Sequence, residues 1–250
     1  MLVKVCGSGD NQELLRRLAT AYETLHPGID IEVADSIGSS GGVKATAKGR
    51  CDIGRLARPL KEKEKRYGLS YTLFARSPVV FLVSENINDV KGITARQVVD
   101  VFSGKITSWQ DLGGGAGNIY IANREKGDSS RTVIGKLLPD FARISKQVGQ
   151  TIYSTPETID TIAGHDNVIA YAPLSAVINR DDIHVLAFEG VLPSVETITT
   201  GRYPLYSDYG LVCRSDVSQA ALAFMKFMTT DQAKSIISDF GAAPVFSEQK

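Results

Sequence analysis

Residues 123–132, with the sequence NREKGDSSRT, place cations, hydroxyls and free backbone amides where an apolar helical pattern begins. A helix start exposes unpaired N–H groups and the positive end of the helix dipole, so small residues there let an oxyanion approach closely. Arg124 can add a forked, charge-assisted pair of hydrogen bonds to the same oxyanion. The segment therefore predicts an anion-binding site, and the alternative is an ordinary helix capped by Asp and Ser.

The N-terminal region repeats a strand, turn and helix pattern that ends each strand in polar residues. Residues 2–6 predict a strand, and Leu14, Leu15, Leu18, Tyr22 and Leu25 predict one apolar face of a helix. Residues 29–33 alternate as a second strand, the glycine-serine segment 36–42 predicts a turn before a helix at 43–48, and residues 51–54 predict a third strand. In an open parallel sheet, ligands bind at the carboxyl ends of the strands. The three turns therefore predict a second group of ligand-binding residues.

The rest of the chain continues as an α/β pattern without a flexible linker. The charge run 61–66 alternates in sign and predicts a solvated helical face. The remaining predicted elements are strand 79–83, helix 98–102, helix 132–148, strand 168–171, a helix starting near Pro173, strands 184–188 and 211–213, and helices 220–228 and 231–240.

Composition argues against several classes of protein. The 250 residues carry 28 Lys and Arg against 28 Asp and Glu, so no net charge favours a nucleic-acid or membrane-surface partner. No apolar run reaches the roughly 20 residues needed to span a bilayer. The chain has no G-x-x-x-x-G-K-[ST] loop, no G-x-S-x-G motif and no nucleophile with a recognisable base, which argues against an enzyme.

The cysteines and histidines are scattered singly. Cys6, Cys51 and Cys213 form no C-x-x-C pair, and no histidine stands beside them, so the spacing argues against a zinc site or a Cys–His nucleophile. We expect structural thiols, because Cys6 and Cys213 lie in strand-like runs where a free cysteine behaves as a small apolar residue. One disulfide is compatible with the sequence, and its pairing stays open.

Three longer motifs resemble the phosphate-binding proteins of bacterial ABC phosphate uptake systems, members of the two-lobed periplasmic solute receptors. The most specific is residues 93–114, ITARQVVDVFSGKITSWQDLGG, and the others are GSSGG at 38–42 and IAYAPLS at 169–175. Looser matches are ARPL at 57–60 and GAAPV at 241–245. Together they extend along nearly the whole chain.

The resemblance implies an α/β, two-lobed periplasmic-binding-protein-like fold with two crossover segments and an interlobe ligand cleft. Residues 1–78 with 204–250 would form lobe one, and residues 79–203 would form lobe two. The family binds its oxyanion with backbone amides, hydroxyls and one arginine, without a metal or cofactor. The matching ligand-binding positions in this sequence are Gly9, Asp10, Asn11, Ser39, Ala57, Arg58, Arg124, Asp128, Ser129 and Ser130.

Some of these positions have a structural alternative. Asp10 and Asn11 could simply cap the first helix. Arg55 and Arg58 could both be solvated, and only the resemblance favours Arg58. Tyr171 and Trp109 are interpreted as core aromatics.

The sequence departs from the family at two places that matter for specificity. Some members carry an aspartate where this chain has Ala57, and that aspartate accepts the proton of hydrogen phosphate. Members commonly show Gly-Ser-Gly-Thr where this chain has residues 127–130, GDSS. A carboxylate accepts a hydrogen bond from a protonated oxyanion but repels sulfate, which has no proton to offer. Asp128 or Asp10 could take over this task; if neither does, sulfate, molybdate or tungstate becomes a credible ligand.

The resemblance implies a solute receptor, not an enzyme, that binds inorganic phosphate and delivers it to the membrane permease of an ABC transporter. We expect a monomer in the periplasm or another extracytoplasmic location, with no nucleic-acid partner. The N-terminus lacks a signal-peptide pattern, which fits a mature form of such a receptor. The alternatives are a receptor for another oxyanion and a cytoplasmic anion-sensing domain.

Overall fold

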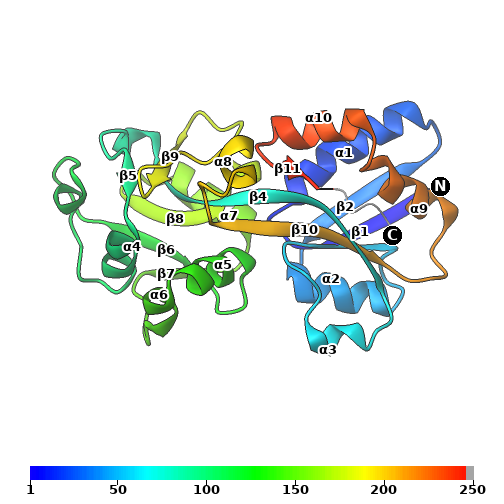
Figure 1. Cartoon of the computed structure of the whole chain (residues 1–250), viewed down its shortest axis with the longest axis horizontal. Helices are drawn as coiled ribbons and strands as arrows, with labels where there is room; N and C mark the ends of the chain where they lie inside the picture. Colours follow the sequence, from blue (N-terminus) through cyan, green and yellow to red (C-terminus); the bar gives the residue numbers. More distant parts are fainter. Residues whose placement is uncertain (246–250) are drawn as a thin grey trace. The chain divides into compact units, whose positions relative to one another are not determined.

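The computed structural model describes residues 1–245, which fall into two α/β units. Unit 1 is Met1–Ser77 together with the chain from Ser207 onward, and unit 2 is Pro78–Tyr206. The chain therefore passes from one unit to the other twice (Figure 1). This confirms the predicted class of fold, a two-lobed α/β protein with two crossover segments.

Unit 1 is built on a sheet with strand order β2-β1-β3-β10. Its first elements are β1 (Leu2–Gly7), α1 (Gln12–Leu25), β2 (Asp30–Ser36), α2 (Gly38–Ala47), β3 (Ile53–Leu56) and α3 (Glu62–Lys65). Strand β1 runs parallel to both neighbours, with Val5 opposite Val33 and Ile53, whereas β10 (Tyr206–Cys213) runs antiparallel to β3. The carboxyl ends of β1, β2 and β3 therefore lie at one edge of the sheet.

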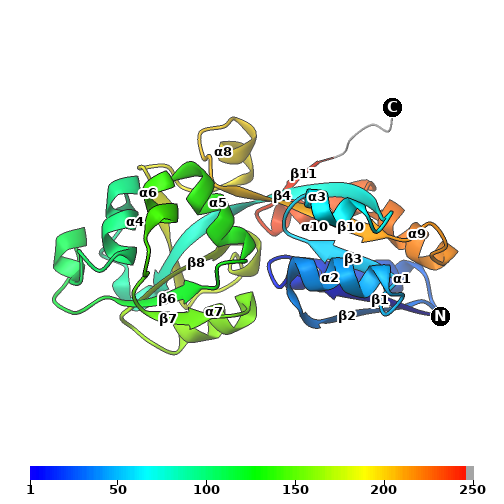
Figure 2. The ribbon, with the colours of Figure 1, turned by 90° about the horizontal axis from the view of Figure 1, so that it is seen from below.

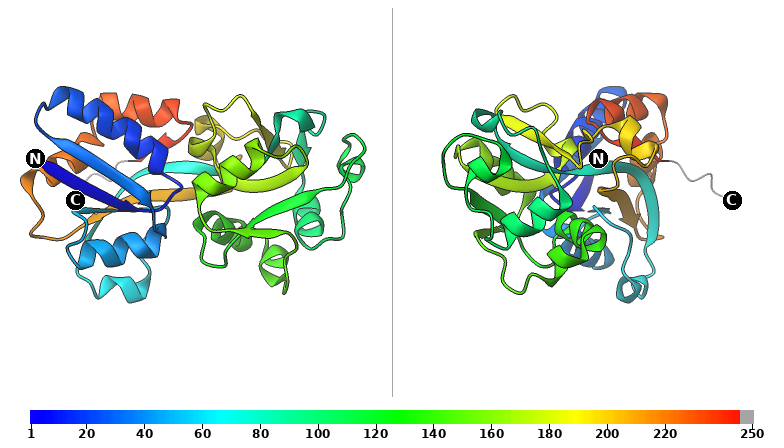
Figure 3. Two further views of the ribbon diagram at one scale, coloured as in Figure 1. Left: turned by 180° about the vertical axis from the view of Figure 1, so that it is seen from behind. Right: turned by 60° about the vertical axis from the view of Figure 1, so that its left-hand side comes forward.

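Helices cover both faces of this sheet. Helices α1 and α10 (Asp231–Asp239) lie on one face and α2 lies on the other (Figures 1 and 3). The α1 face carries the larger apolar cluster, in which Leu14, Leu15 and Leu18 are fully buried with Phe224 of α9 (Gln219–Phe227). Of the apolar face predicted for α1, only Leu25 is exposed. Strand β11 (Ala243–Pro244) pairs with β4 (Ser70–Ser84).

Unit 2 has the strand order β4-β8-β6-β7, with β9 beside β4. Its elements are β5 (Gly92–Ile93), α4 (Ala95–Phe102), β6 (Tyr120–Arg124), α5 (Ser129–Leu137), α6 (Pro139–Arg143), β7 (Gln150–Ile152), α7 (Thr155–Ala163), β8 (Val168–Pro173), β9 (Ile183–Phe188) and α8 (Val195–Thr199), with 3-10 turns at Glu85–Ile87, Trp109–Leu112 and Leu174–Ala176. Helices α4 and α6 lie side by side (Figure 2). Phe102 of α4, Phe141 of α6 and Tyr171 of β8 form an aromatic cluster between them and the sheet.

Three predicted segments form a different kind or number of elements from those expected. The helix predicted over 132–148 is two helices, because Pro139 has no N–H to continue the first and begins the second. The helix predicted near Pro173 is only the 3-10 turn Leu174–Ala176. The glycine-serine segment predicted as a turn is the first part of α2, where a Cβ on Gly42 would lie 2.8 Å from the carbonyl oxygen of Cys6. Glycine there lets the helix pack closely on β1.

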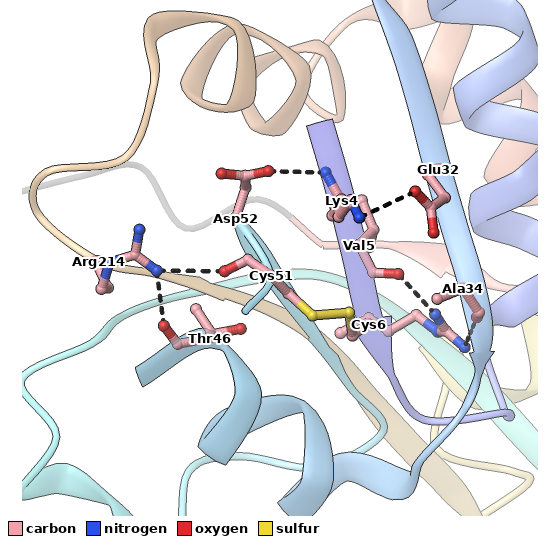
Figure 4. Close-up of a disulfide and its surroundings, with 10 residues drawn as sticks. Lys4, Val5, Cys6, Glu32, Ala34, Thr46, Cys51, Asp52 and Arg214 are labelled. Carbon is pink, nitrogen blue, oxygen red and sulfur yellow. Dashed lines mark hydrogen bonds and ion pairs between the residues drawn. A yellow bond between two sulfur atoms is a disulfide. The ribbon is translucent and has the colours of Figure 1, made fainter. Parts of the chain in front are cut away.

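A disulfide joins Cys6 at the end of β1 to Cys51 just before β3, with a Cα–Cα distance of 6.1 Å (Figure 4). Cys213 is a buried free thiol. The expectation of three structural thiols was therefore wrong for Cys6 and Cys51, because the parallel pairing of β1 with β3 brings together two cysteines that are 45 positions apart in the sequence. Within the described residues, no helix is both long and apolar enough to cross a bilayer.

A thiol count tests this pairing. Denatured protein is expected to take up one iodoacetamide label without reductant, on Cys213, and three labels after reduction, as counted by intact mass. Peptide mapping under the non-reducing condition should find the single label on the peptide of Cys213. Three labels without reductant would contradict the disulfide.

Candidate anion-binding site

In unit 1 the predicted ligand residues gather at the carboxyl edge of the parallel strands. Gly9, Asp10 and Asn11 follow β1, Ser39 lies in the first turn of α2 after β2, and Ala57 follows β3. Two hydrogen bonds join these turns. The Ala57 amide donates to Ser39 Oγ at 3.2 Å, and Asn11 Nδ2 donates to the carbonyl of Leu56 at 3.0 Å. The structure thus brings these five residues together, as the sheet topology predicts.

Asn11 stands before α1, but its side chain does not cap that helix. Its amide group is fully buried, and Oδ1 accepts no hydrogen bond from any residue that the structure describes. Asp10 is also buried, at 3 % exposure, and its carbonyl accepts a hydrogen bond from the Tyr209 hydroxyl at 2.9 Å. The capping alternative is therefore wrong for Asn11, and a buried acceptor without a donor suits a protonated ligand.

The Arg58 guanidinium is bound to its own unit. It makes a two-pronged ion pair with Glu64 of α3, 2.8 Å on each branch, and donates to Ser40 Oγ at 2.9 Å. Burial by itself would raise the pKa of Glu64, but the hydrogen bond and charge of Arg58 bring that pKa below its ordinary value. The charge run 61–66 is therefore not a wholly solvated face, because Glu64 is buried against Arg58.

Arg55, which the sequence left as a possible solvated residue, is wholly buried. Its guanidinium donates to the carbonyls of Ser8 at 2.7 Å, Val5 at 3.1 Å and Ala34 at 2.8 Å, and to Gln12 Oε1 at 2.8 Å. A solvated role is therefore excluded for this residue. Burial lowers its pKa to about 10, so the guanidinium stays protonated at neutral pH.

In unit 2, Arg124 ends β6 at the carboxyl edge of its sheet and is 4 % exposed. Its guanidinium pairs with Asp128 at 2.8 Å and donates to the hydroxyls of Thr155 at 3.1 Å and Thr158 at 3.3 Å. Its Nε is buried and has no partner among the described residues. Arg124 is thus a buried cation that is held by three contacts and keeps an unpartnered Nε.

The helix start beside Arg124 has the predicted form. Asp128 is the N-cap of α5, its carboxylate accepting from the Arg131 amide at 2.8 Å, and Ser129 and Ser130 are the buried first residues of the helix. The capping role considered for Asp128 is therefore confirmed, and its other carboxylate oxygen contacts Arg124. The Arg131 side chain donates to the Arg124 carbonyl at 2.6 Å and ties the helix to the strand.

Behind Arg124 lies a buried tyrosine. The Tyr171 hydroxyl donates to Asn123 Oδ1 at 2.9 Å and accepts from the Arg124 amide at 3.3 Å. Burial, followed by the Asp128 carboxylate, raises the pKa of Tyr171. Tyr171 and Trp109 are both core residues, as interpreted from the sequence. The neutral Tyr171 thus fixes the backbone from which Arg124 projects.

Sequence reasoning missed three residues of these two groups: Arg55, Thr155 and Thr158. The two threonines had a readable signal, since positions i and i+3 at a helix start face the same way. The sequence carried no signal for the burial of Arg55, because only the fold shows whether a charged residue in a strand is buried or solvated.

The predicted ligand residues of both units include donors that suit an oxyanion. Unit 2 has a buried guanidinium and a helix start, and unit 1 has amides and hydroxyls at three strand ends. Among residues 1–245, no group of three or more His, Cys, Asp or Glu side chains is placed to hold a metal ion. The chemistry displayed is recognition by charge and hydrogen bonds.

Comparison with known proteins gives a consistent result. The family described as the PBP superfamily domain matches residues 2–232. Phosphate-binding protein PstS of Bacillus subtilis is 27 % identical over 246 residues, covering 96 % of this chain and 80 % of the relative. A phosphate-binding protein PstS of Borreliella burgdorferi is 24 % identical over 251 residues, covering 96 % and 88 %.

A crystal structure from Clostridium perfringens, assigned as a phosphate ABC transporter substrate-binding protein and holding bound phosphate, superposes with a TM-score of 0.88 at 26 % identity, covering 98 % of this chain and 100 % of that one. An alternating α/β fold in two units, with polar turns at the carboxyl ends of its strands, is typical of two-lobed solute-binding proteins. The chain belongs to the PBP superfamily. The resemblance to the phosphate-binding proteins of ABC transporters is confirmed.

Proposed function

We propose that this protein is a solute receptor that binds inorganic phosphate and delivers it to an ABC transporter. The observation that carries the proposal is the buried Arg124 at the end of β6, next to the start of α5 with Ser129 and Ser130. A cation and a helix start together suit a small oxyanion and offer nothing specific to an apolar ligand. The full-length similarity to a structure that contains phosphate supports this ligand. Such a receptor performs no catalysis.

We further propose that the two groups of residues bind one and the same phosphate. The ligand set would be Gly9, Asp10, Asn11, Ser39, Ala57 and Arg58 from unit 1 and Arg124, Asp128, Ser129 and Ser130 from unit 2. Since these residues belong to units joined by two crossovers, binding would select a state in which both groups contact the ion.

Calorimetry tests the shared site through its stoichiometry. We expect one phosphate to bind per chain. Ser39→Ala in unit 1 and Ser130→Ala in unit 2 should each weaken this binding by about tenfold, because each removes one hydrogen bond to a charged ligand. Two phosphates per chain, or a silent variant in either unit at unchanged thermal stability, would contradict a shared site.

Arg58 is expected to serve this site through its backbone and not its guanidinium. Both terminal nitrogens of Arg58 are occupied, by the two Glu64 carboxylate oxygens at 2.8 Å each and by Ser40 Oγ, whereas Arg124 keeps a buried Nε without a partner among the described residues. Arg58→Ala should weaken phosphate binding by less than about tenfold, while it leaves Glu64 buried without its partner and lowers the free energy of unfolding by about 3 kcal/mol. A loss of affinity as large as that of an Arg124 variant would show that Arg58 binds the ligand directly.

The proposal places the receptor outside the cytoplasm, as a monomer that meets the permease of its transporter. The Cys6–Cys51 disulfide supports this location, because disulfides persist in oxidising compartments. No role in nucleic-acid binding is proposed, since the net charge is zero.

A further inference from the structure

We propose that Arg55 supplies a buried, unpaired positive charge that strengthens anion binding at the loop between β1 and α1. This inference rests on the proposed function, since it concerns how the unit 1 residues hold the same oxyanion. Arg55 is not one of the ligand residues proposed above. Its role would be to position the loop and to supply positive charge.

The unusual feature of Arg55 is that all its hydrogen-bond acceptors are neutral. The four bonds go to three backbone carbonyls and the side-chain amide of Gln12. No carboxylate of the described residues lies within ion-pair distance of its guanidinium, which has no exposed surface. Figure 4 shows the carbonyls of Val5 and Ala34 that receive two of these bonds. A buried cation without a counter-ion costs folding free energy, which an apolar side chain would avoid.

The charged groups nearest to Arg55 do not cancel it. Arg16 lowers its pKa, and Asp35 and Glu13 raise it by smaller amounts. Both carboxylates are already paired with Arg16, at 3.2 Å and 2.7 Å, and both are largely exposed to solvent that screens them. The buried guanidinium is screened much less, so its field persists toward the loop.

Arg55 also holds the two ends of that loop. One bond goes to Ser8 before the predicted ligand residues 9–11, and another goes to Gln12, the first residue of α1. The Ser8 amide in turn donates to the Arg55 carbonyl at 3.0 Å. A Cβ on Gly7, whose φ is +147°, would collide with that carbonyl oxygen. The Arg55 guanidinium is thus hydrogen-bonded to the residues on both sides of the predicted ligand residues 9–11.

Gln12→Glu tests the charge with little change of shape. Glutamate is nearly isosteric and would place a carboxylate 2.8 Å from the Arg55 guanidinium, which neutralises the cation and satisfies it. We expect phosphate binding to weaken by about tenfold, because the ligand loses the attraction of one nearby positive charge. The melting temperature should stay the same or rise. Unchanged affinity would mean that the charge of Arg55 does not act on the ligand.

Gln219→Glu is the matched control, since Gln219 is the exposed first residue of α9 in the same unit. It adds the same charge at the same helix position, away from Arg55, and should leave phosphate affinity unchanged. Arg55→Lys is the second variant: it keeps the charge and loses the fork, so it should bind phosphate more tightly than Gln12→Glu while melting lower than the wild type.

The titrations use full-length protein and inorganic phosphate. If the wild type binds phosphate and Gln12→Glu binds it equally well, the inference is overturned and the proposed function stands. If Gln219→Glu weakens binding as much as Gln12→Glu, general charge and not Arg55 is responsible, which also overturns it. A wild type that does not bind phosphate would overturn the proposed function itself.

Discussion

Arg124→Ala is expected to weaken phosphate binding by about 2–5 kcal/mol, the loss seen when one partner of a buried charge pair is removed. The reason lies in its surroundings. The side chain is 4 % exposed and is held by Asp128 and two threonine hydroxyls, so its removal leaves a buried site without its cation. Arg124→Lys should recover only part of the loss, because the planar fork is gone. Calorimetric titration measures both effects.

Two controls separate binding from folding. Arg143→Ala removes an arginine of the same unit whose carboxylate partner, Asp140, is exposed, and it should leave affinity unchanged. Arg124→Ala also strands the buried Asp128 carboxylate, so the double variant Arg124→Ala/Asp128→Asn should fold more stably than the single one and still bind weakly. Wild-type affinity in either Arg124→Ala protein would remove Arg124 from the site.

Asp128→Asn is expected to change the choice of anion. Asparagine can still cap α5, but the charge next to Arg124 is removed. A fixed carboxylate repels an oxyanion that has no proton, so its removal should strengthen sulfate binding relative to phosphate by about 100-fold, roughly 3 kcal/mol of relieved repulsion. Competition titrations with the two anions give this ratio directly.

Asp140→Asn is the control for this change, since Asp140 is an exposed carboxylate at the start of α6 in the same unit. It should leave the ratio unchanged. Asp10→Asn tests the other candidate acceptor. If both Asp128→Asn and Asp10→Asn keep the wild-type ratio, neither carboxylate selects the anion, and the buried Oδ1 of Asn11 becomes the acceptor to examine.

The local sequence pattern was sufficient to predict an element and its buried face where one face of that element is apolar. Leu14, Leu15 and Leu18 predicted both α1 and its buried face, and all three are fully buried. The parallel direction of β1, β2 and β3 followed from the repeated strand, turn and helix pattern, and it accounts for the gathering of the first turns at one edge. Boundaries failed where a single residue decided them, as Pro139 did by dividing the predicted helix 132–148.

Contacts between residues far apart in the sequence could not be predicted from local pattern. The Cys6–Cys51 pairing and the burial of Arg55 both depend on which strands become neighbours. The threonines that hold Arg124 come from α7, 31 and 34 residues further along the chain. By contrast, Arg124 and Asp128 lie within one loop and helix start, so their local spacing was enough to predict that they belong to one group, although their ion pair was not predicted.

The most direct test of the proposed function is a calorimetric titration of the wild-type protein with phosphate, sulfate, molybdate and tungstate under one set of conditions. We predict that one phosphate binds per chain, more tightly than any of the other three anions. Binding of sulfate, molybdate or tungstate more tightly than phosphate, or no heat with phosphate in a sample shown to be folded, would contradict it.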